Sequence, residues 1–221
     1  MNVLIIGASR GLGLEFVRQY RAAGARVVAT ARSEPALAAL TALGARPLKL
    51  DVLDAASVSG LAWQIDGEAF DVVVINAGVF GPRAAALEAP TQDDFDAVMR
   101  TNVLGPMRLL PQVAEALAPG ARLALISSTM GAIAGRSSSS GSLYRASKAA
   151  LNSVMKDASL ALAGKATVIS FHPGWVRTDM GGAGADIDPA TSIAGMRTVL
   201  ASVKQIDTGS FFNYDGRRLN W

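Results

Sequence analysis

The sequence lacks cysteine altogether and has a single histidine, His172, among its 221 residues. Without cysteine the chain can have no disulfide framework, no thiolate nucleophile and no zinc site with cysteine ligands. With one histidine, the usual nitrogen ligands for transition metals are missing as well. We therefore expect no metal centre.

Long hydrophobic runs are also missing. No stretch approaches the roughly 18 consecutive apolar residues that a membrane span requires. The first apolar run, in Met1–Gly7, has no basic segment before it and ends too soon for a signal peptide. We expect a cytoplasmic protein that does not bind a membrane.

A strong charge of either sign is absent too. The chain has 21 basic and 18 acidic residues, a net charge of +3. The basic residues are scattered rather than gathered in a stripe, so nucleic acid is not an expected partner. Half of the residues are hydrophobic, which is enough to bury one large core. We predict a single domain over residues 1–221.

What the sequence does contain is an alternation of short, β-branched apolar runs with longer helical patterns, which indicates βαβ units. The predicted strands are 2–6, 26–31, 47–50, 71–76, 122–127, 167–171 and 210–214. The predicted helices are about 12–23, 34–43, 55–64, 92–117, 143–162 and 190–203, with Ser33, Asp54 and Thr91 as N-caps. The strand runs are apolar throughout, as expected where helices cover both faces of a sheet. The pattern predicts a doubly wound α/β fold with a seven-stranded, mostly parallel sheet.

A glycine-rich segment, Gly7-Ala8-Ser9-Arg10-Gly11-Leu12-Gly13, follows the first predicted strand. Glycines there permit a tight turn and a close approach to phosphate, while the next helix offers free N–H groups and the positive end of its dipole. A glycine turn before a helix can be purely structural. Its place between a strand and a helix favours the dinucleotide cradle of a Rossmann fold.

Tyr144 and Lys148 are four residues apart, so on a helix they share one face. An adjacent ammonium, together with the positive nicotinamide of an oxidised cofactor, lowers the pKa of a phenol and makes it a proton-transfer group. A bare Y-x-x-x-K is more often an ordinary amphipathic helix, and here the context favours catalysis. Ser128 follows the fifth predicted strand, where its hydroxyl can stabilise developing alkoxide charge. Ser127 and Thr129 compete for that role.

Together these segments closely resemble the short-chain dehydrogenase/reductase superfamily, in its order along the chain. The matches are Gly7, Gly11 and Gly13, Asp51-Val52, Asn76-Ala77-Gly78, Asn102, Ser128, Tyr144 with Lys148, and Pro173-Gly174 to Thr178. The short length and the ending Phe212 to Trp221 resemble more specifically the sniffer and C-factor branch of carbonyl reductases. The resemblance implies an oxidoreductase that reduces an aldehyde, ketone or quinone, or oxidises the corresponding alcohol. The alternative is a dinucleotide-binding signalling or regulatory protein of the C-factor type, without important turnover.

The resemblance also implies a role for each matching residue. The implied catalytic residues are Asn102, Ser128, Tyr144 and Lys148. Tyr144 would act as the acid or base, and Lys148 would also hydrogen-bond the nicotinamide ribose. Asn102 would interrupt a long helix and help link Lys148 to solvent by a water. Asp51 would accept from the adenine amino group, although an aspartate there could equally cap a helix. Within the single domain we expect a cofactor-binding half of about 1–120 and a catalytic and substrate-loop half of about 121–221. The implied cofactor-binding residues are Gly7, Ser9, Arg10, Gly11, Leu12, Gly13, Arg32, Ser33, Asp51, Val52, Asn76, Ala77, Gly78, Tyr144, Lys148, Pro173, Gly174, Val176 and Thr178.

The end of the second predicted strand, Thr30-Ala31-Arg32-Ser33, bears on which nicotinamide cofactor is used. An NAD site usually has an acidic residue about 20 residues past the fingerprint, whereas an NADP site has arginine. No acid is present here, and Arg32 and Arg10 could converge on a 2′-phosphate. NADP(H) is the predicted cofactor, with NAD(H) as the alternative.

Some positions depart from the family pattern. Ile6 stands where the family often has threonine, and the loop Arg136–Ser142 is enlarged, so the substrate is left open. We interpret His172 as a structural histidine. The glycine-rich segment Gly181–Asp186 is predicted to be a mobile lid. By resemblance, the helices about 92–117 and 143–162 would pair subunits into a homodimer or homotetramer.

Overall fold

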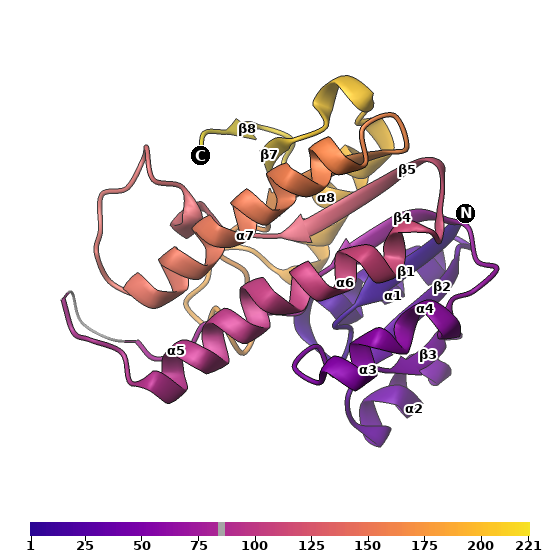
Figure 1. The fold of residues 1–221 in the computed structure, drawn as a ribbon, viewed down its shortest axis with the longest axis horizontal. Coiled ribbons are helices and arrows are strands. Elements are labelled where there is room, and N and C mark those ends of the chain that lie inside the picture. The colour runs from indigo at the N-terminus through magenta and orange to yellow at the C-terminus, as the bar shows by residue number, and fades with distance from the viewer. Residues whose placement is uncertain (84–86) are drawn as a thin grey trace.

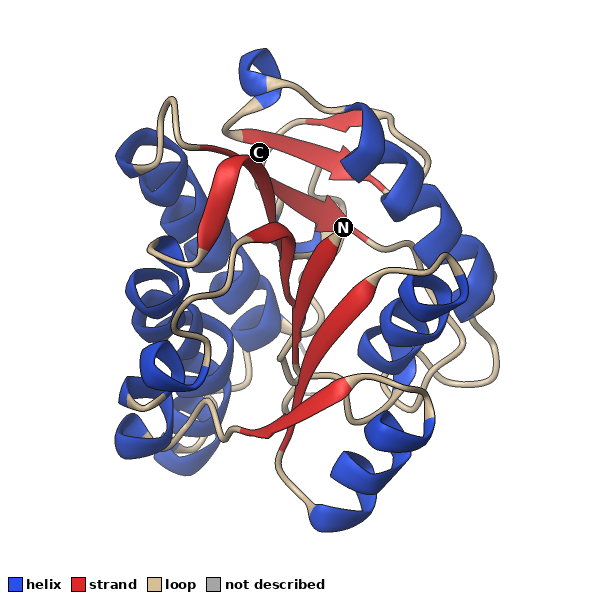
Figure 2. Ribbon diagram, turned by 90° about the vertical axis from the view of Figure 1, so that its right-hand side faces the viewer, coloured by secondary structure: helices blue, strands red, loops and turns tan. Residues whose placement is uncertain are grey.

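A single eight-stranded sheet forms the centre of the computed structural model, which describes residues 1–83 and 87–221 (Figure 2). The strand order is β3-β2-β1-β4-β5-β6-β7-β8. Neighbouring strands are parallel except β7 and β8, which are antiparallel. The strands are β1 (Asn2–Ile6), β2 (Arg26–Ala31), β3 (Arg46–Lys49), β4 (Phe70–Ile75), β5 (Leu117–Ile126), β6 (Ala166–His172), β7 (Ser210–Asn213) and β8 (Arg218–Leu219). The predicted α/β, doubly wound and mostly parallel fold is confirmed.

The predicted count of seven strands is wrong, because β8 adds an eighth. This strand has two residues, which pair with Phe211 and Phe212 of β7. A two-residue strand has no periodic pattern of its own. Only its return against β7 makes it part of the sheet.

The helices are α1 (Gly11–Ala22), α2 (Glu34–Ala42), α3 (Ala55–Ser59), α4 (Leu61–Gln64), α5 (Gln92–Met99), α6 (Gly105–Ala114), α7 (Ser142–Ala161) and α8 (Pro189–Ser202) (Figure 1). Two predicted helices are corrected. The helix predicted over 55–64 divides at Gly60, and the one predicted over 92–117 is interrupted by a π-helical turn, Arg100–Leu104. The end of that second prediction is also wrong, because Leu117 already belongs to β5.

Two of the three predicted N-caps make the expected bond. Asp54 accepts from the Ala56 N–H, and Thr91 accepts from the Asp94 N–H. Ser33 occupies the N-cap position of α2, but its side chain makes no capping hydrogen bond. That prediction is corrected, since α2 begins at Glu34 without a side-chain cap.

Helices cover both faces of the sheet, and alternate residues of the strands supply two separate cores (Figure 2). In β1, Val3 and Ile5 pack with residues of α1 and α8, while Leu4 and Ile6 pack with residues of α3, α6 and α7. Successive strand side chains point to opposite faces. An all-apolar strand is therefore what a sheet covered on both sides requires.

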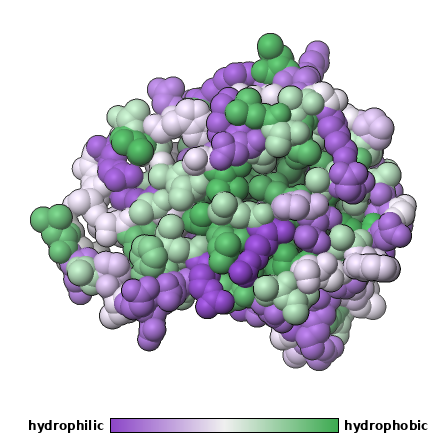
Figure 3. All heavy atoms as spheres, in the orientation of Figure 1, coloured by the Kyte–Doolittle hydropathy of each residue, from purple (hydrophilic) through white to green (hydrophobic). Residues whose placement is uncertain are grey.

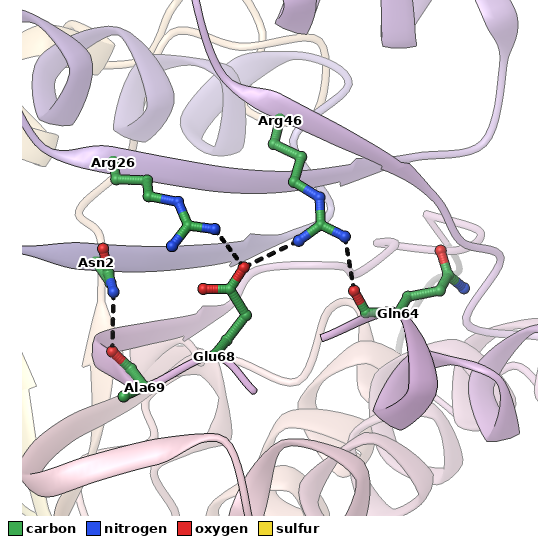
Figure 4. A network of polar contacts seen from close by, with 6 residues as sticks. All are labelled: Asn2, Arg26, Arg46, Gln64, Glu68 and Ala69. Carbon is green, nitrogen blue, oxygen red and sulfur yellow. Dashed lines mark hydrogen bonds and ion pairs between the residues drawn. The ribbon is translucent and has the colours of Figure 1, made fainter. Parts of the chain in front are cut away.

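A buried carboxylate organises the amino-terminal edge of the sheet (Figure 4). Glu68 precedes β4, and its side chain, only 7% exposed, accepts from Arg26 of β2 and, at 2.9 Å, from Arg46 of β3. Arg46 also donates to the Gln64 carbonyl at 2.8 Å. These contacts lie at the edge opposite to the carboxyl ends of the strands, where the glycine turn is.

In the part of the chain that the structure describes, no helix is both long enough and apolar enough to cross a membrane.

Candidate active site

The glycine turn lies between the carboxyl end of β1 and the start of α1, and two of its glycines have no room for a side chain. Gly7 has a φ of +86°, and a Cβ there would come within 2.8 Å of the Ala77 backbone. A Cβ at Gly13 would lie 2.1 Å from the Gly7 carbonyl oxygen. The turn therefore packs tightly on the segment that directly follows β4 and leaves its outer side to a ligand.

Two side chains brace this turn, one in β2 and one directly after β4. The Gly7 N–H donates to Thr30 Oγ1 at 3.0 Å, and Asn76 Nδ2 donates to the Gly7 carbonyl at 2.7 Å. Sequence reasoning found Asn76 but missed Thr30, which follows the glycine turn by more than a whole helix. Ile6, which stands where the family often has threonine, has no hydroxyl to stabilise the turn, and the hydroxyl of Thr30 in β2 accepts a hydrogen bond from the turn instead.

A cavity of about 350 Å³ opens beside the turn, along the carboxyl ends of the strands. The predicted residues that line it are Gly7, Ser9, Arg10, Gly11, Leu12, Arg32, Val52, Asn76, Ala77, Gly78 and Thr178. Met180, which the resemblance places in the substrate-lid region, also lines it, and the lining residues that sequence reasoning missed are Thr30, Ala31, Leu50, Leu53, Val79, Ala97, Thr101 and Asp179. Most of these are apolar neighbours in the sheet or the adjoining loops, and a motif does not mark them.

Several predicted cofactor residues do not line this cavity, namely Gly13, Ser33, Asp51, Tyr144, Lys148, Pro173, Gly174 and Val176. Asp51 has a local role, because its Oδ1 accepts from the Leu53 N–H at 3.0 Å. It does not cap α3, whose cap is Asp54. Gly13 supports the turn from behind, against the Gly7 carbonyl.

An exposed ion pair lies in the lining of the cavity. Arg10 Nη1 lies 2.7 Å from Asp179 Oδ2, and both side chains are largely exposed. Both residues line the cavity, Arg10 from the glycine turn and Asp179 from the segment after β6. The pair joins two segments that a ligand in the cavity would contact.

Tyr144 lies in the first turn of α7 and is only 7% exposed. Burial raises the pKa of its phenol to about 12, and a side-chain hydrogen bond with Ser128 opposes that rise. Ser127 is committed elsewhere, since its Oγ donates to Asn152 Oδ1 at 2.6 Å in the interior. Of the two serines, Ser128 is the one that meets Tyr144.

Lys148 is buried one turn after Tyr144, with its Nζ 5.6 Å from the centre of the Tyr144 ring. The Nζ donates to the Ile126 carbonyl at 2.9 Å. Burial lowers the pKa of Lys148 to about 8. The Lys148 ammonium is thus held close to the Tyr144 phenol, as the four-residue spacing of the two side chains on one helix predicts.

Asn102 is fully buried within the π-helical turn between α5 and α6. Its Oδ1 accepts from the Val79 N–H at 2.8 Å, and its Nδ2 donates to the Val79 carbonyl at 2.8 Å and to Ser147 Oγ at 2.9 Å. The side chain therefore links the segment after β4 to α7, next to Lys148.

The segment predicted to be a lid carries several hydrogen bonds at its two ends. Trp175 Nε1 donates to the Gly181 carbonyl at 2.9 Å, and Arg177 Nη1 donates to the carbonyls of Ala185 and Asp186 at 3.1 Å each. The two ends of the glycine-rich run are therefore bonded to the segment before it, and the preceding residue, Met180, lines the cavity.

His172 ends β6 on the same side of the sheet. Burial lowers its pKa to about 4, so the ring is neutral at physiological pH. Its Nε2 lies 3.4 Å from Thr129 Oγ1. Thr129, the third candidate for the serine role, thus faces His172.

A protein-family model described as short chain dehydrogenase matches residues 1–186. Among curated proteins, the chain is similar to C-signal of Myxococcus xanthus, with 36% identity over 154 residues that cover 68% of this chain and 92% of the relative.

Solved structures with the same architecture cover the whole chain. Carbonyl reductase Sniffer of D. melanogaster has a TM-score of 0.88 and 30% identity, covering 100% of this chain and 99% of that one. A carbonyl reductase from Pseudomonas aeruginosa PAO1 in complex with NADP has a TM-score of 0.86 and 30% identity, with coverage of 100% and 99%.

Proposed function

The chain belongs to the short chain dehydrogenase family, and on that premise we propose that it is an NADP(H)-dependent carbonyl reductase. The observation that carries the proposal is the meeting of Ser128, Tyr144 and Lys148 near the carboxyl edge of the sheet, where the glycine turn opens into a cavity. Dehydrogenase chemistry needs both parts within reach of one ligand.

The cavity residues fit a dinucleotide. The turn around Gly7 and Gly13 has space for backbone only, so a phosphate can approach its N–H groups closely. Arg10 and Arg32 line the same cavity, and the end of β2 has no acidic residue that would repel a 2′-phosphate. Relatives crystallised with NADP support the same choice.

The chain's own residues supply proton transfer and charge stabilisation. When bound, the reduced nicotinamide supplies a hydride to the carbonyl carbon. The Ser128 hydroxyl donates a hydrogen bond to the carbonyl oxygen, and Tyr144 gives that oxygen its proton as negative charge develops. With a pKa of about 12, Tyr144 carries its proton at neutral pH and is ready to donate it.

Lys148 makes the reverse reaction accessible. Alcohol oxidation requires the phenolate of Tyr144, and a positive charge 5.6 Å from the ring favours that form. The bond from Lys148 Nζ to the Ile126 carbonyl holds the ammonium in place. Asn102 holds the adjoining segments, so we assign it a positioning role.

A C-signal-like function without important turnover is the second candidate, and the 36% identity to C-signal favours it. NADPH oxidation with a panel of aldehydes, ketones and quinones separates the two. We expect turnover in the unmodified chain and its collapse in Tyr144→Phe, with the NADPH dissociation constant within a few-fold. A Tyr144→Phe variant that kept most of its activity would contradict the proposed mechanism.

We also propose one domain over residues 1–221, a cytoplasmic location and a homodimer or homotetramer. Hydrophobic side chains gather over the middle of the face where α6 and α7 lie (Figure 3). On those helices Met107 is 52% and Leu160 65% exposed. Light scattering should give a mass at least twice the 22.8 kDa of one chain.

A further inference from the structure

The Phe80 ring lies on Tyr144. The two ring centres are 4.5 Å apart and the planes are inclined by only 24°, which is a stacked arrangement. Phe80 directly follows Val79, whose backbone N–H and carbonyl are both bonded to the Asn102 side chain at 2.8 Å. A buried amide therefore fixes the point from which the Phe80 side chain reaches Tyr144.

Arg83 also contacts the Phe80 ring. Its guanidinium carbon lies 5.0 Å from the centre of the Phe80 ring, and its Nη2 donates to the Met180 carbonyl at 3.2 Å. We name residues 80–83 the Phe80–Arg83 strap. Through the Arg83 side chain, the strap connects the segment after β4 to the segment after β6.

The side chains of Phe80 and Met130 both come close to Gly141. A Cβ on Gly141 would lie 3.3 Å from Phe80 Cζ and 3.1 Å from Met130 Cε, and the φ of Gly141 is +68°. The glycine thus leaves space that the two apolar side chains share. Methionine is polarizable and packs well against aromatic groups.

The cavity described above reaches Val79 and Met180, and Tyr144 does not line it. Val79 adjoins the strap, and Met180 is the residue to which Arg83 is bonded. A carbonyl that hydrogen-bonds to the Tyr144 phenol must bring its attached body within a few ångströms of that phenol. Phe80, stacked on the Tyr144 ring, is an apolar side chain within that range.

We infer that Phe80 is the specificity-determining residue of the carbonyl site, selecting substrates with a flat aromatic body next to the carbonyl, and that Arg83 positions it. This inference rests on the proposed function. When such a substrate enters, Phe80 exchanges its stacking contact with Tyr144 for one with the substrate ring. A saturated body cannot replace the contact, because stacking depends on two aromatic faces.

The test compares benzaldehyde with cyclohexanecarbaldehyde, which have similar size and differ in aromaticity. Phe80→Leu keeps an apolar side chain and removes the ring, and Phe95→Leu, at an exposed position of α5, is the control. We expect Phe80→Leu to raise KM for benzaldehyde about 3- to 10-fold relative to the saturated aldehyde, with kcat little changed. Arg83→Gln should raise the same ratio about 2- to 5-fold. Phe95→Leu should leave it unchanged, and all three variants should keep their NADPH affinity.

Equal losses for both aldehydes in Phe80→Leu would overturn the inference, since Phe80 would then be only structural. An improved KM for benzaldehyde would also overturn it, because Phe80 would then merely block the site. If the unmodified chain binds NADPH but reduces no carbonyl, the proposed function fails, and saturation-transfer NMR with benzyl alcohol and cyclohexylmethanol still decides. Selective loss of benzyl alcohol binding in Phe80→Leu supports the aromatic site, and equal binding in both proteins refutes it.

Discussion

Replacing Lys148 by methionine should change how the stability of the cofactor-free protein depends on pH. Lys148 is 4% exposed, and its ammonium donates to the Ile126 carbonyl at 2.9 Å. Burial disfavours the charged form of the side chain. Methionine has a similar length and no charge, so Lys148→Met removes the unfavourable desolvation while filling the same space.

The magnitude follows from the pKa of Lys148, which burial lowers from 10.5 to about 8. That difference corresponds to about 3 kcal/mol against folding while the lysine is charged in both states. The variant also leaves the Ile126 carbonyl without its donor, which costs about 1–3 kcal/mol. The two effects partly cancel at pH 7, so the absolute difference is small and the pH dependence is the sharper observable.

The sign is set by which state binds more protons. Between pH 8 and 10.5 the unfolded chain keeps the Lys148 proton and the folded chain loses it, so the stability of the parent rises with pH. The variant lacks this rise. Its stability relative to the parent should therefore fall by about 2 kcal/mol from pH 7 to 9.5. Tyr144 is present in both proteins, and its pKa of about 12 lies above this window.

Urea unfolding at pH 7, 8.5 and 9.5, with linear extrapolation, measures the free energies of unfolding. The matched control is Lys49→Met, because the Lys49 ammonium is largely exposed and paired with Glu34. Its stability relative to the parent should change much less over the same range. If the stability of Lys148→Met relative to the parent stays constant or rises with pH, the reasoning is refuted.

Three further predictions concern the cofactor cavity. Ala31→Asp places a carboxylate at the end of β2, so it should reverse a preference for NADPH over NADH in titrations; equal dissociation constants in the parent would contradict this. Asp179→Asn frees Arg10 from an exposed ion pair and should tighten NADPH binding up to about fivefold, and an unchanged constant would show that the pair does not compete. Amides of Gly181–Asp186 should exchange faster than those of the flanking elements without ligands and become protected when cofactor and substrate bind; protection that is high from the start would indicate a fixed wall.

The contact between Phe80 and Tyr144 could not be predicted from the sequence. The sequence marks Asn76-Ala77-Gly78 as a motif, but nothing in it indicates that the next aromatic residue stacks on Tyr144, which follows it by about a quarter of the chain. The same holds for Asn102, which the family resemblance marks as the interruption of a helix. Its bonds to Val79 and Ser147 are known only from the structure.

The sequence by itself determined the parallel α/β architecture, the bounds of β1 and β2, the place of the glycine turn, and the shared helical face of Tyr144 and Lys148. These features depend on neighbours within one turn or one strand, so periodicity and spacing report them. Only the tertiary structure decided the short strand β8, the Thr30 brace, the choice of Ser128 over Ser127 as the partner of Tyr144, and the strap over that phenol. Each of these joins segments far apart in the chain, and such contacts depend on the strand order and on how the connecting loops pack.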